Sequence, residues 1–285
     1  MHTLKYTIFG SAMRVYSDWL FLFALYSLVN RLLAVRKTVS MSARKNRRLH
    51  AGGKRCLWCG RRIILPGLLA LVVISFLLVL PFRWLTPPST AFMQHAKSSS
   101  LGGATPCAVI DWRWINWSQI SPQIALAVIA AEDQRFPDHW GLDPQAISSA
   151  WQDRGERRMR GGSTVTQQLI KNLYLWPGQS WLRKAIEAWL ALVVESSWPK
   201  QRILEVYLNV VQFDACTFGV EAASRRYFDR SARYLSASQA ASLVAVLPNP
   251  VSLKVDDNSE YLRNRRRWIQ AQMQQLGGTD YLRNL

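Results

Sequence analysis

Residues 121–141 read SPQIALAVIAAEDQRFPDHWG, and this stretch decides how the rest of the chain is interpreted. Ser121 can cap a helix, and Pro122 suits the first helical position. The apolar run that follows predicts a mostly buried helix that ends on two adjacent acids, Glu132 and Asp133. Carboxylates at a helix C-terminus oppose the helix dipole, which favours cations there. Because these acids stand against the local preference, we interpret them as candidates for a chemical role.

The overall charge of the chain indicates an anionic partner. Its 285 residues include 36 Lys or Arg and 18 Asp or Glu, which gives a net charge of +18. Nucleic acid, anionic lipid and a phosphorylated substrate would each suit such a charge. The 13 tryptophans favour a membrane setting, because Trp concentrates at membrane–water interfaces.

One segment is long and apolar enough to cross a bilayer. Residues 63–80, IILPGLLALVVISFLLVL, carry no charge and approach the ~20 residues that a spanning helix needs. Residues 31–62 contain many Lys and Arg and no acid, so the positive-inside rule predicts that residues 1–62 form a cytoplasmic arm. Residues 1–40 of this arm are interpreted either as non-native sequence or as carrying a weak extra apolar segment at 19–29.

The rest of the chain is predicted to be a linker followed by a helical domain. Residues 81–106 are rich in Pro, Ser and Gly, which is typical of a linker. An alternating stretch from residue 107 predicts a short strand or extended segment. Helices are then expected to begin at residues 121, 143, 163 and 180, and to cover 200–211, 236–247 and 259–276. We therefore predict a mainly α domain over residues 107–285.

A second motif, GGSTVTQQLIKNLYL at residues 161–175, predicts a helix with one polar face. Its polar side chains fall within an arc of roughly 140°; they are Thr164, Gln167, Gln168, Lys171 and Asn172. Thr164 and Gln167 also fit an ordinary capping box. The uncharged glutamine pair is unusual for a solvated face, and a Gly-rich turn before a helix suits an anion.

Several smaller features of the sequence can be explained without a functional role. Arg183 and Glu187 stand four residues apart, which by itself is compatible with a simple helix salt bridge. His139 has no second His or Cys at ligand spacing, and the single CxxC at residues 56–59 is too little for a zinc site. Cys107 and Cys216 could pair, but the sequence leaves this open.

Five ordered motifs together resemble the peptidoglycan glycosyltransferases of glycosyltransferase family 51, in particular their monofunctional biosynthetic members. The motifs are EDxxFxxHxG at 132–141, GGSTxTQQxxKN at 161–172, RKxxE at 183–187 with KxxILExYLN at 200–209, FGVEAA with YF at 218–228, and AxLPNP at 245–250. They span about half the chain. Two positions depart from the pattern, since Cys216 stands where Gly is common and Gln239 where an acid is common. No transpeptidase motif follows, so the bifunctional members of the family are not expected.

The resemblance implies a lysozyme-like, mainly α domain with a small membrane-associated lobe, preceded by a transmembrane helix. It implies polymerisation of lipid II into glycan strands, with inversion and release of undecaprenyl pyrophosphate. Glu132 is then the catalytic general base and Glu187 a second catalytic acid on the pyrophosphate side. The implied substrate-binding residues are Asp133, Phe136, His139, Ser163, Thr164, Gln167, Gln168, Lys171, Asn172, Arg183 and Lys184.

The resemblance also implies a setting for the enzyme. We expect a single-pass protein of the bacterial inner membrane, with a cytoplasmic N-terminus and a periplasmic catalytic domain that moenomycin inhibits. The expected partners are lipid II, the growing glycan strand and the bilayer, with other cell wall synthesis or division proteins as candidates and no nucleic acid. No cofactor is required, and a divalent cation, Mg²⁺ or Mn²⁺, at the pyrophosphate is left open.

Two other functions are kept as alternatives. A lytic transglycosylase would cleave glycan with one Glu on a similar fold, without needing the Lys171, Arg183 and Glu187 set. A membrane-tethered protein that binds anionic lipid without turnover would not need Glu132 at all. Glu205 and Asn209 are left open between a structural and a functional role.

Overall fold

The structure is a computed structural model that describes residues 53–98, 106–152, 162–178 and 180–285. Within these ranges most residues are helical and the only strands are two residues long, so the prediction of a mainly α fold is confirmed. The chain separates into two units at Ile63 and Ile64, and most of the first lies outside the described residues. The predictions for residues 1–40 and for the basic arm up to residue 52 fall there.

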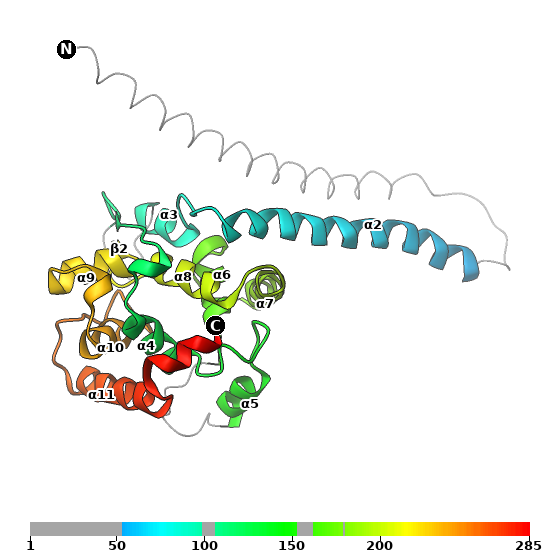
Figure 1. Ribbon diagram of the computed structural model, residues 1–285. Coiled ribbons are helices and arrows are strands. Elements are labelled where there is room, and N and C mark those ends of the chain that lie inside the picture. Colours follow the sequence, from blue (N-terminus) through cyan, green and yellow to red (C-terminus); the bar gives the residue numbers. More distant parts are fainter. Residues whose placement is uncertain (1–52, 99–105, 153–161, 179) are drawn as a thin grey trace, which may run out of the picture. The chain divides into compact units, whose positions relative to one another are not determined.

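Helix α4, Pro122–Glu132, is the centre of the domain. Ser121 caps it as predicted, because its Oγ accepts a hydrogen bond from Gln123 N at 3.2 Å. Residues 124–130 are all buried, so α4 is apolar on every side and needs neighbours all round. Two of these neighbours are α10, Ala237–Ala245, and α11, Glu260–Gln275 (Figure 1). The three helices pack on one another.

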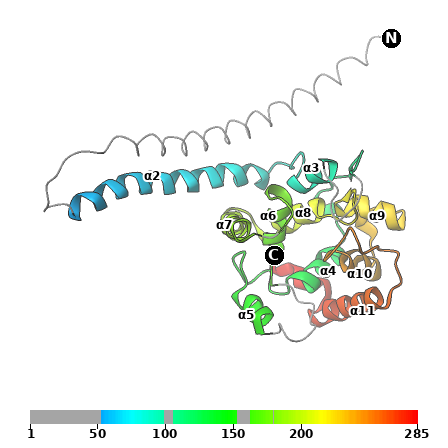
Figure 2. The ribbon, with the colours of Figure 1, turned by 180° about the vertical axis from the view of Figure 1, so that it is seen from behind.

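A second group of helices carries the remaining motifs. Helix α6, Val165–Tyr174, packs against both α7, Trp181–Ser197, and α8, Lys200–Val210 (Figure 2). On α8 the side chain of Asn209 is fully buried and bonds both backbone groups of Ile115 at 2.9 Å. Glu205 Oε1 accepts from the backbone N of Trp117 at 2.8 Å. These contacts give both residues a structural role.

The smaller elements connect these groups. Strand β1, Asp111–Trp112, pairs in parallel with β2, Thr217–Phe218, which confirms the short strand expected after residue 107. Helix α9, Val220–Phe228, which the sequence patterns did not single out, follows β2, and α5 spans Pro144–Gln152. Between β2 and α9, Gly219 has φ +78°, and an added Cβ would lie 2.5 Å from the carbonyl oxygen of Asn209. Only glycine fits this turn. Four 3₁₀ segments complete the described chain: η2, Leu80–Arg83; η4, Trp117–Gln119; η6, Ala232–Tyr234; and η7, Gly278–Asn284.

Helix α2, Gly53–Val79, contains the predicted apolar span. Within the described residues, Leu65–Arg83 is the one helical stretch long and apolar enough to cross a membrane. Its C-terminal part contacts the second helix group, since Trp189 Nε1 donates to Ser75 Oγ at 2.9 Å. Tyr174 likewise donates its hydroxyl to the carbonyl oxygen of Leu78 at 3.2 Å. The end of the apolar helix is therefore fixed to α6 and α7.

Part of the segment interpreted as a linker, residues 81–106, is helical. Residues 91–98 form α3, Ala91–Ser98, which packs on α6 (Figures 1 and 2). Thr90 supplies the local reason, because its Oγ1 accepts from Met93 N at 3.1 Å at the start of the helix. Met93 and Ala96, three residues apart, are buried together with Cys107 and Phe218. The Ser-rich composition concealed this short amphipathic pattern.

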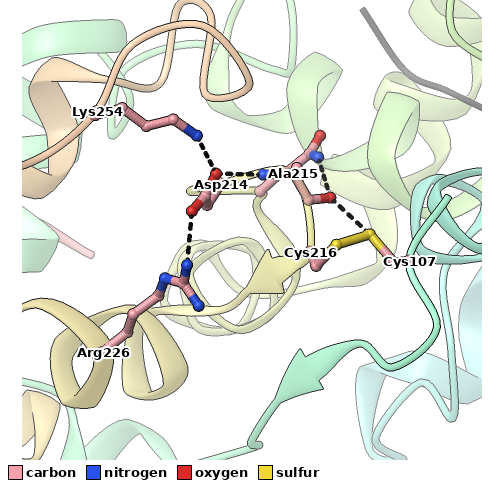
Figure 3. The surroundings of a disulfide bond; sticks show 7 residues. Cys107, Asp214, Ala215, Cys216, Arg226 and Lys254 are labelled. Atoms are coloured by element: carbon pink, nitrogen blue, oxygen red, sulfur yellow. Dashed lines mark hydrogen bonds and ion pairs between the residues drawn. A yellow bond between two sulfur atoms is a disulfide. The ribbon is translucent and has the colours of Figure 1, made fainter. Parts of the chain in front are cut away.

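A disulfide closes this second small core. Cys107 and Cys216 are bonded, with their Cα atoms 5.7 Å apart, which answers the pairing that the sequence left open (Figure 3). Beside it, Lys254 and Arg226 both point at the carboxylate of Asp214 (Figure 3). Burial alone would raise the pKa of Asp214, but the hydrogen bonds to Lys254 and to the backbone outweigh it and lower that pKa. The loop before β2 is thus tied by both a covalent bond and ion pairs.

Candidate active site

Glu132 is the last residue of α4, and three side chains from other helices surround it. Gln168 Nε2 on α6 donates to Glu132 Oε2 at 2.9 Å, and Arg265 Nη2 on α11 lies 3.2 Å from Oε1. Tyr207 on α8 donates its hydroxyl to Gln168 Oε1 at 3.0 Å and so fixes the orientation of that amide. The Glu132 side chain is 14% exposed, so it is oriented by its neighbours and not fully buried.

The next acid in the chain has a different environment. Asp133 is buried, and its carboxylate accepts from the backbone N of Val165 at 2.9 Å and from His139 Nε2 at 2.8 Å. His139 Nδ1 accepts from the backbone N of Gly141 at 3.1 Å, so the proton lies on Nε2 and is donated to Asp133. Phe136, also predicted to contact substrate, is fully buried. The predicted substrate contacts of these three residues stay predictions, since their contacts here are with protein.

The start of α6 is a capping box, as its pattern indicated. Thr164 Oγ1 accepts from Gln167 N at 3.2 Å, and Gln167 Oε1 accepts from Thr164 N at 3.1 Å. Both side chains are buried, and Thr164 also donates to the carbonyl oxygen of Gly141 at 2.7 Å. Asn172, one turn beyond Gln168, is buried and donates to the carbonyl oxygen of Gln168 at 2.8 Å. Of the predicted polar face, Gln168 is the residue that contacts Glu132.

The start of α7 carries a group of charges around one buried acid. Arg183 Nη1 lies 3.0 Å from Glu187 Oε2, and Lys184 forms an ion pair with Oε1 of the same carboxylate. Lys184 also donates to Ser163 Oγ at 2.9 Å, which joins α7 to the turn before α6. The Nε atom of Arg183 is buried and has no hydrogen-bond partner among the described residues. An anion at this place would satisfy it.

Lys171 on α6 belongs to the same group. Burial lowers the pKa of the Lys171 amine below its usual 10.5. Glu187 and Glu132 act to raise this pKa, whereas Arg183 and Lys184 lower it further. The amine therefore lies within the electrostatic reach of both predicted catalytic acids. It makes no hydrogen bond or ion pair to any other described residue. We call Lys171, Arg183, Lys184 and Glu187 the cation cluster, which has three positive charges and one negative.

A divalent metal does not fit the protein groups around Glu187. Both of its carboxylate oxygens are engaged by cations, and its charged neighbours would repel Mg²⁺ or Mn²⁺. In the described part of the chain no three His, Cys, Asp or Glu side chains are grouped as metal ligands. No chemical step is therefore assigned to a metal here.

Two residues at the site were not identified from the sequence. Arg265 lies in the run NRRRW, which has the composition of a solvated face, yet the side chain is 4% exposed and contacts Glu132. The signal was its spacing, because Leu262, Arg265, Ile269 and Met273 share the buried face of α11. Tyr207 lies in the YLN motif and is fully buried. Its hydroxyl donates a hydrogen bond to Gln168. Burial raises the pKa of that hydroxyl, so it acts as a hydrogen-bond donor.

The family model described as Transglycosylase matches residues 106–274, which include every residue of this site. The chain belongs to the transglycosylase family. The family predicted from the five motifs is thereby confirmed, and so is the expectation of an enzyme that transfers glycosyl groups. Both catalytic acids proposed from the motifs lie within the matched domain.

Similar transglycosylases are found in several bacteria. The biosynthetic peptidoglycan transglycosylase of Ectopseudomonas mendocina is 46% identical over 225 residues, which cover 79% of this chain and 93% of that protein. That of Stutzerimonas stutzeri is 48% identical over 221 residues, or 76% and 90% of the two chains. That of Salmonella heidelberg is 47% identical over 224 residues, or 78% and 93%.

Proposed function

We propose that this transglycosylase polymerises lipid II into the glycan strands of peptidoglycan, releasing undecaprenyl pyrophosphate. The names of its relatives support peptidoglycan synthesis as the process. One observation supports the mechanism most strongly. A partly exposed carboxylate, Glu132, lies near the cation cluster, and the Lys171 amine interacts electrostatically with both Glu132 and Glu187. Glycosyl transfer from a lipid pyrophosphate needs both parts, a base for the acceptor hydroxyl and positive charge for the leaving group.

Glu132 is the general base of the proposed reaction. It takes the proton from the 4-hydroxyl of the acceptor sugar as that oxygen forms a bond to the anomeric carbon of the donor. The bond between this carbon and the pyrophosphate oxygen breaks, and attack from the opposite face inverts the anomeric centre. Gln168 and Arg265 hold one carboxylate oxygen each, so the carboxylate is oriented before the acceptor arrives.

The cation cluster is the proposed site of the leaving pyrophosphate. Lys171, Arg183 and Lys184 would stabilise the negative charge that develops as the glycosidic bond breaks. Glu187 has a positioning role in this proposal, because its buried carboxylate holds Arg183 and Lys184 side by side. This assignment gives Glu187 the role of orienting cations and does not use a metal.

The remaining motif residues are proposed to hold the helices of the site in position. Asp133 joins the end of α4 to the first turn of α6 through Val165 N, and His139 completes that buried pair. Thr164 and Gln167 fix the start of α6, so that Gln168 and Lys171 project from a defined helix. Ser163 holds Lys184. Direct contact of these residues with substrate stays a prediction from the motifs.

We propose a location in the bacterial inner membrane, with the N-terminus in the cytoplasm and the catalytic domain in the periplasm. The helix over Leu65–Arg83 is long enough for the single span, and the basic residues before it favour the cytoplasmic side. The bond between Cys107 and Cys216 supports an oxidising compartment for the domain. Bilayer lipid and other cell wall synthesis or division proteins are the proposed further partners.

The test is an incubation of the purified full chain with labelled lipid II, followed by gel electrophoresis. A ladder of polymer that disappears with moenomycin is the expected result. Shortening of preformed glycan strands without new polymer would favour a lytic transglycosylase instead. No change in either substrate would contradict the proposed enzyme.

A further inference from the structure

An aromatic side chain outside all five motifs covers the amine of Lys171. The Nζ atom lies 5.7 Å from the centroid of the Phe92 ring. Phe92 is on α3, in the segment that the sequence indicated to be a linker, and α3 packs directly on α6 (Figures 1 and 2). The ring is thus brought to the cation cluster by a helix that precedes the catalytic domain in the chain.

We propose that Phe92 is a positioning residue for Lys171 during glycosyl transfer. The inference rests on the proposed function, in which Lys171 stabilises the leaving pyrophosphate. The face of an aromatic ring carries partial negative charge and attracts an ammonium within about 6 Å. Lys171 has a flexible four-carbon stem and no hydrogen bond or ion pair to another described residue, so the ring is its one identified anchor there.

The structure fixes α3 firmly enough for such a role. Met93 and Ala96, next to and one turn beyond Phe92, are both 2% exposed against Cys107 and Phe218. Cys107 N donates to the carbonyl oxygen of Ala96 at 2.9 Å, and the disulfide joins Cys107 to Cys216 beside β2. A covalent bond and a buried cluster therefore hold the helix that presents the ring.

The contact also has a predicted electrostatic consequence. Burial disfavours the charged amine of Lys171, whereas the ring favours it. The charged groups that face this amine are Glu187, Arg183 and Lys184 on α7 and Glu132 on α4, and a change at Phe92 leaves them in place. Replacing the ring by an aliphatic side chain keeps the apolar cover but removes the attraction. The amine should then lose its proton at a lower pH.

The experiment compares Phe92→Leu with Phe92→Tyr in the full chain, measured as lipid II polymerisation across pH. We expect Phe92→Leu to lower kcat/KM by about threefold to tenfold, in line with a partly desolvated cation–π contact. The alkaline limb of its pH–activity profile should move to lower pH. Phe92→Tyr keeps the ring and should stay within about twofold of the unchanged protein, with the same alkaline limb. Phe92→Met is a second ringless variant with a longer, unbranched side chain, for use if Phe92→Leu does not fold.

The same substitutions in a Lys171→Ala background separate positioning from mere packing. Phe92→Leu should cause no further loss there, because its effect passes through the amine. An equal loss in both backgrounds, or an unchanged rate for Phe92→Leu and Phe92→Met with Lys171 present, would overturn the inference. If Lys171→Ala alone retains the normal rate, it is the pyrophosphate assignment of the proposed function that fails.

Discussion

The two charged regions of the site differ in how their charges are balanced. At the end of α4, the single carboxylate of Glu132 is held by one amide and one guanidinium, and part of it is open. At the start of α7, the carboxylate of Glu187 is buried between two cations, with a third cation nearby on α6. The first arrangement suits a group that must accept a proton. The second leaves net positive charge and suits an anionic leaving group.

The difference shows that two glutamates of one motif set need not share a role. Their environments differ, because the Glu187 side chain is 3% exposed and ion-paired with two cations, whereas the Glu132 side chain is 14% exposed. Glu132 has neighbours that orient it without closing it off. The comparison therefore supports the proposed roles, proton transfer for Glu132 and charge organisation for Glu187.

The largest expected effect is at the base. Glu132→Gln keeps the shape of the side chain but removes its ability to accept the proton, so polymerisation should fall by at least ~10²-fold. The control is the unfolding midpoint, which should show that the variant is folded. A polymerisation rate near that of the unchanged protein would remove Glu132 from the mechanism.

A smaller loss is expected in the cation cluster. Lys171→Ala or Arg183→Ala removes one charge-assisted contact to the pyrophosphate, which corresponds to roughly tenfold to hundredfold in rate. Donor use should weaken more than acceptor use, and binding of undecaprenyl pyrophosphate should weaken in parallel. Lys97→Ala, at an exposed lysine of α3, is the matched control and should change neither quantity. Equal loss on the donor and acceptor sides would argue against the pyrophosphate assignment.

The two regions also differ in whether a disulfide stabilises the core beside them. Glu132, the proposed base, ends α4 in the main core, whereas α3 contacts the cation cluster and belongs to the small core closed by Cys107 and Cys216. A Cys107→Ser/Cys216→Ser variant should lose about 2–4 kcal/mol of unfolding free energy, since the bond closes a long loop. Denaturant unfolding measures this, with Cys56→Ser/Cys59→Ser as the control. If the two double variants unfold alike, the small core is not stabilised by the bond.

The smallest expected effect is on the alkaline side of the pH profile. Burial lowers the pKa of Lys171, so its positive charge is present at low pH and is lost as pH rises through that lowered value. Activity should therefore decline at a lower pH than an ordinary lysine would impose. Lys171→Arg stays charged and should extend the alkaline limb, whatever its effect on the maximum rate. If the alkaline limb of the pH–activity profile is identical in Lys171→Arg and in the unchanged protein, a group other than Lys171 determines it.

Local patterns in the sequence predicted most of the helices, and its motifs singled out Glu132 and Glu187 as candidate catalytic residues. Ser121 and Thr164 cap helices as expected, and Glu132 ends α4, because capping and apolar runs act over a few residues. The patterns did not reveal α3 or α9, whose apolar faces are short and lie in polar surroundings.

The contacts between distant segments could not be predicted in the same way. Arg265 is 133 residues from Glu132 and Phe92 is far from Lys171 in the chain, so only the packing of α11 and α3 brings them to the site. The pairing of Cys107 with Cys216 was open for the same reason. The spacing of Arg265 with Leu262 and Ile269 places it on the apolar face of α11, but the sequence does not indicate that it contacts Glu132.

The central claim is that proton transfer and leaving-group binding reside in separate regions. The most direct test measures Glu132→Gln twice, once for lipid II polymerisation and once for binding of undecaprenyl pyrophosphate. We predict a loss of polymerisation of at least ~10²-fold with product binding unchanged. Polymerisation at the normal rate, or a loss of product binding as large as that of Lys171→Ala, would contradict the separation.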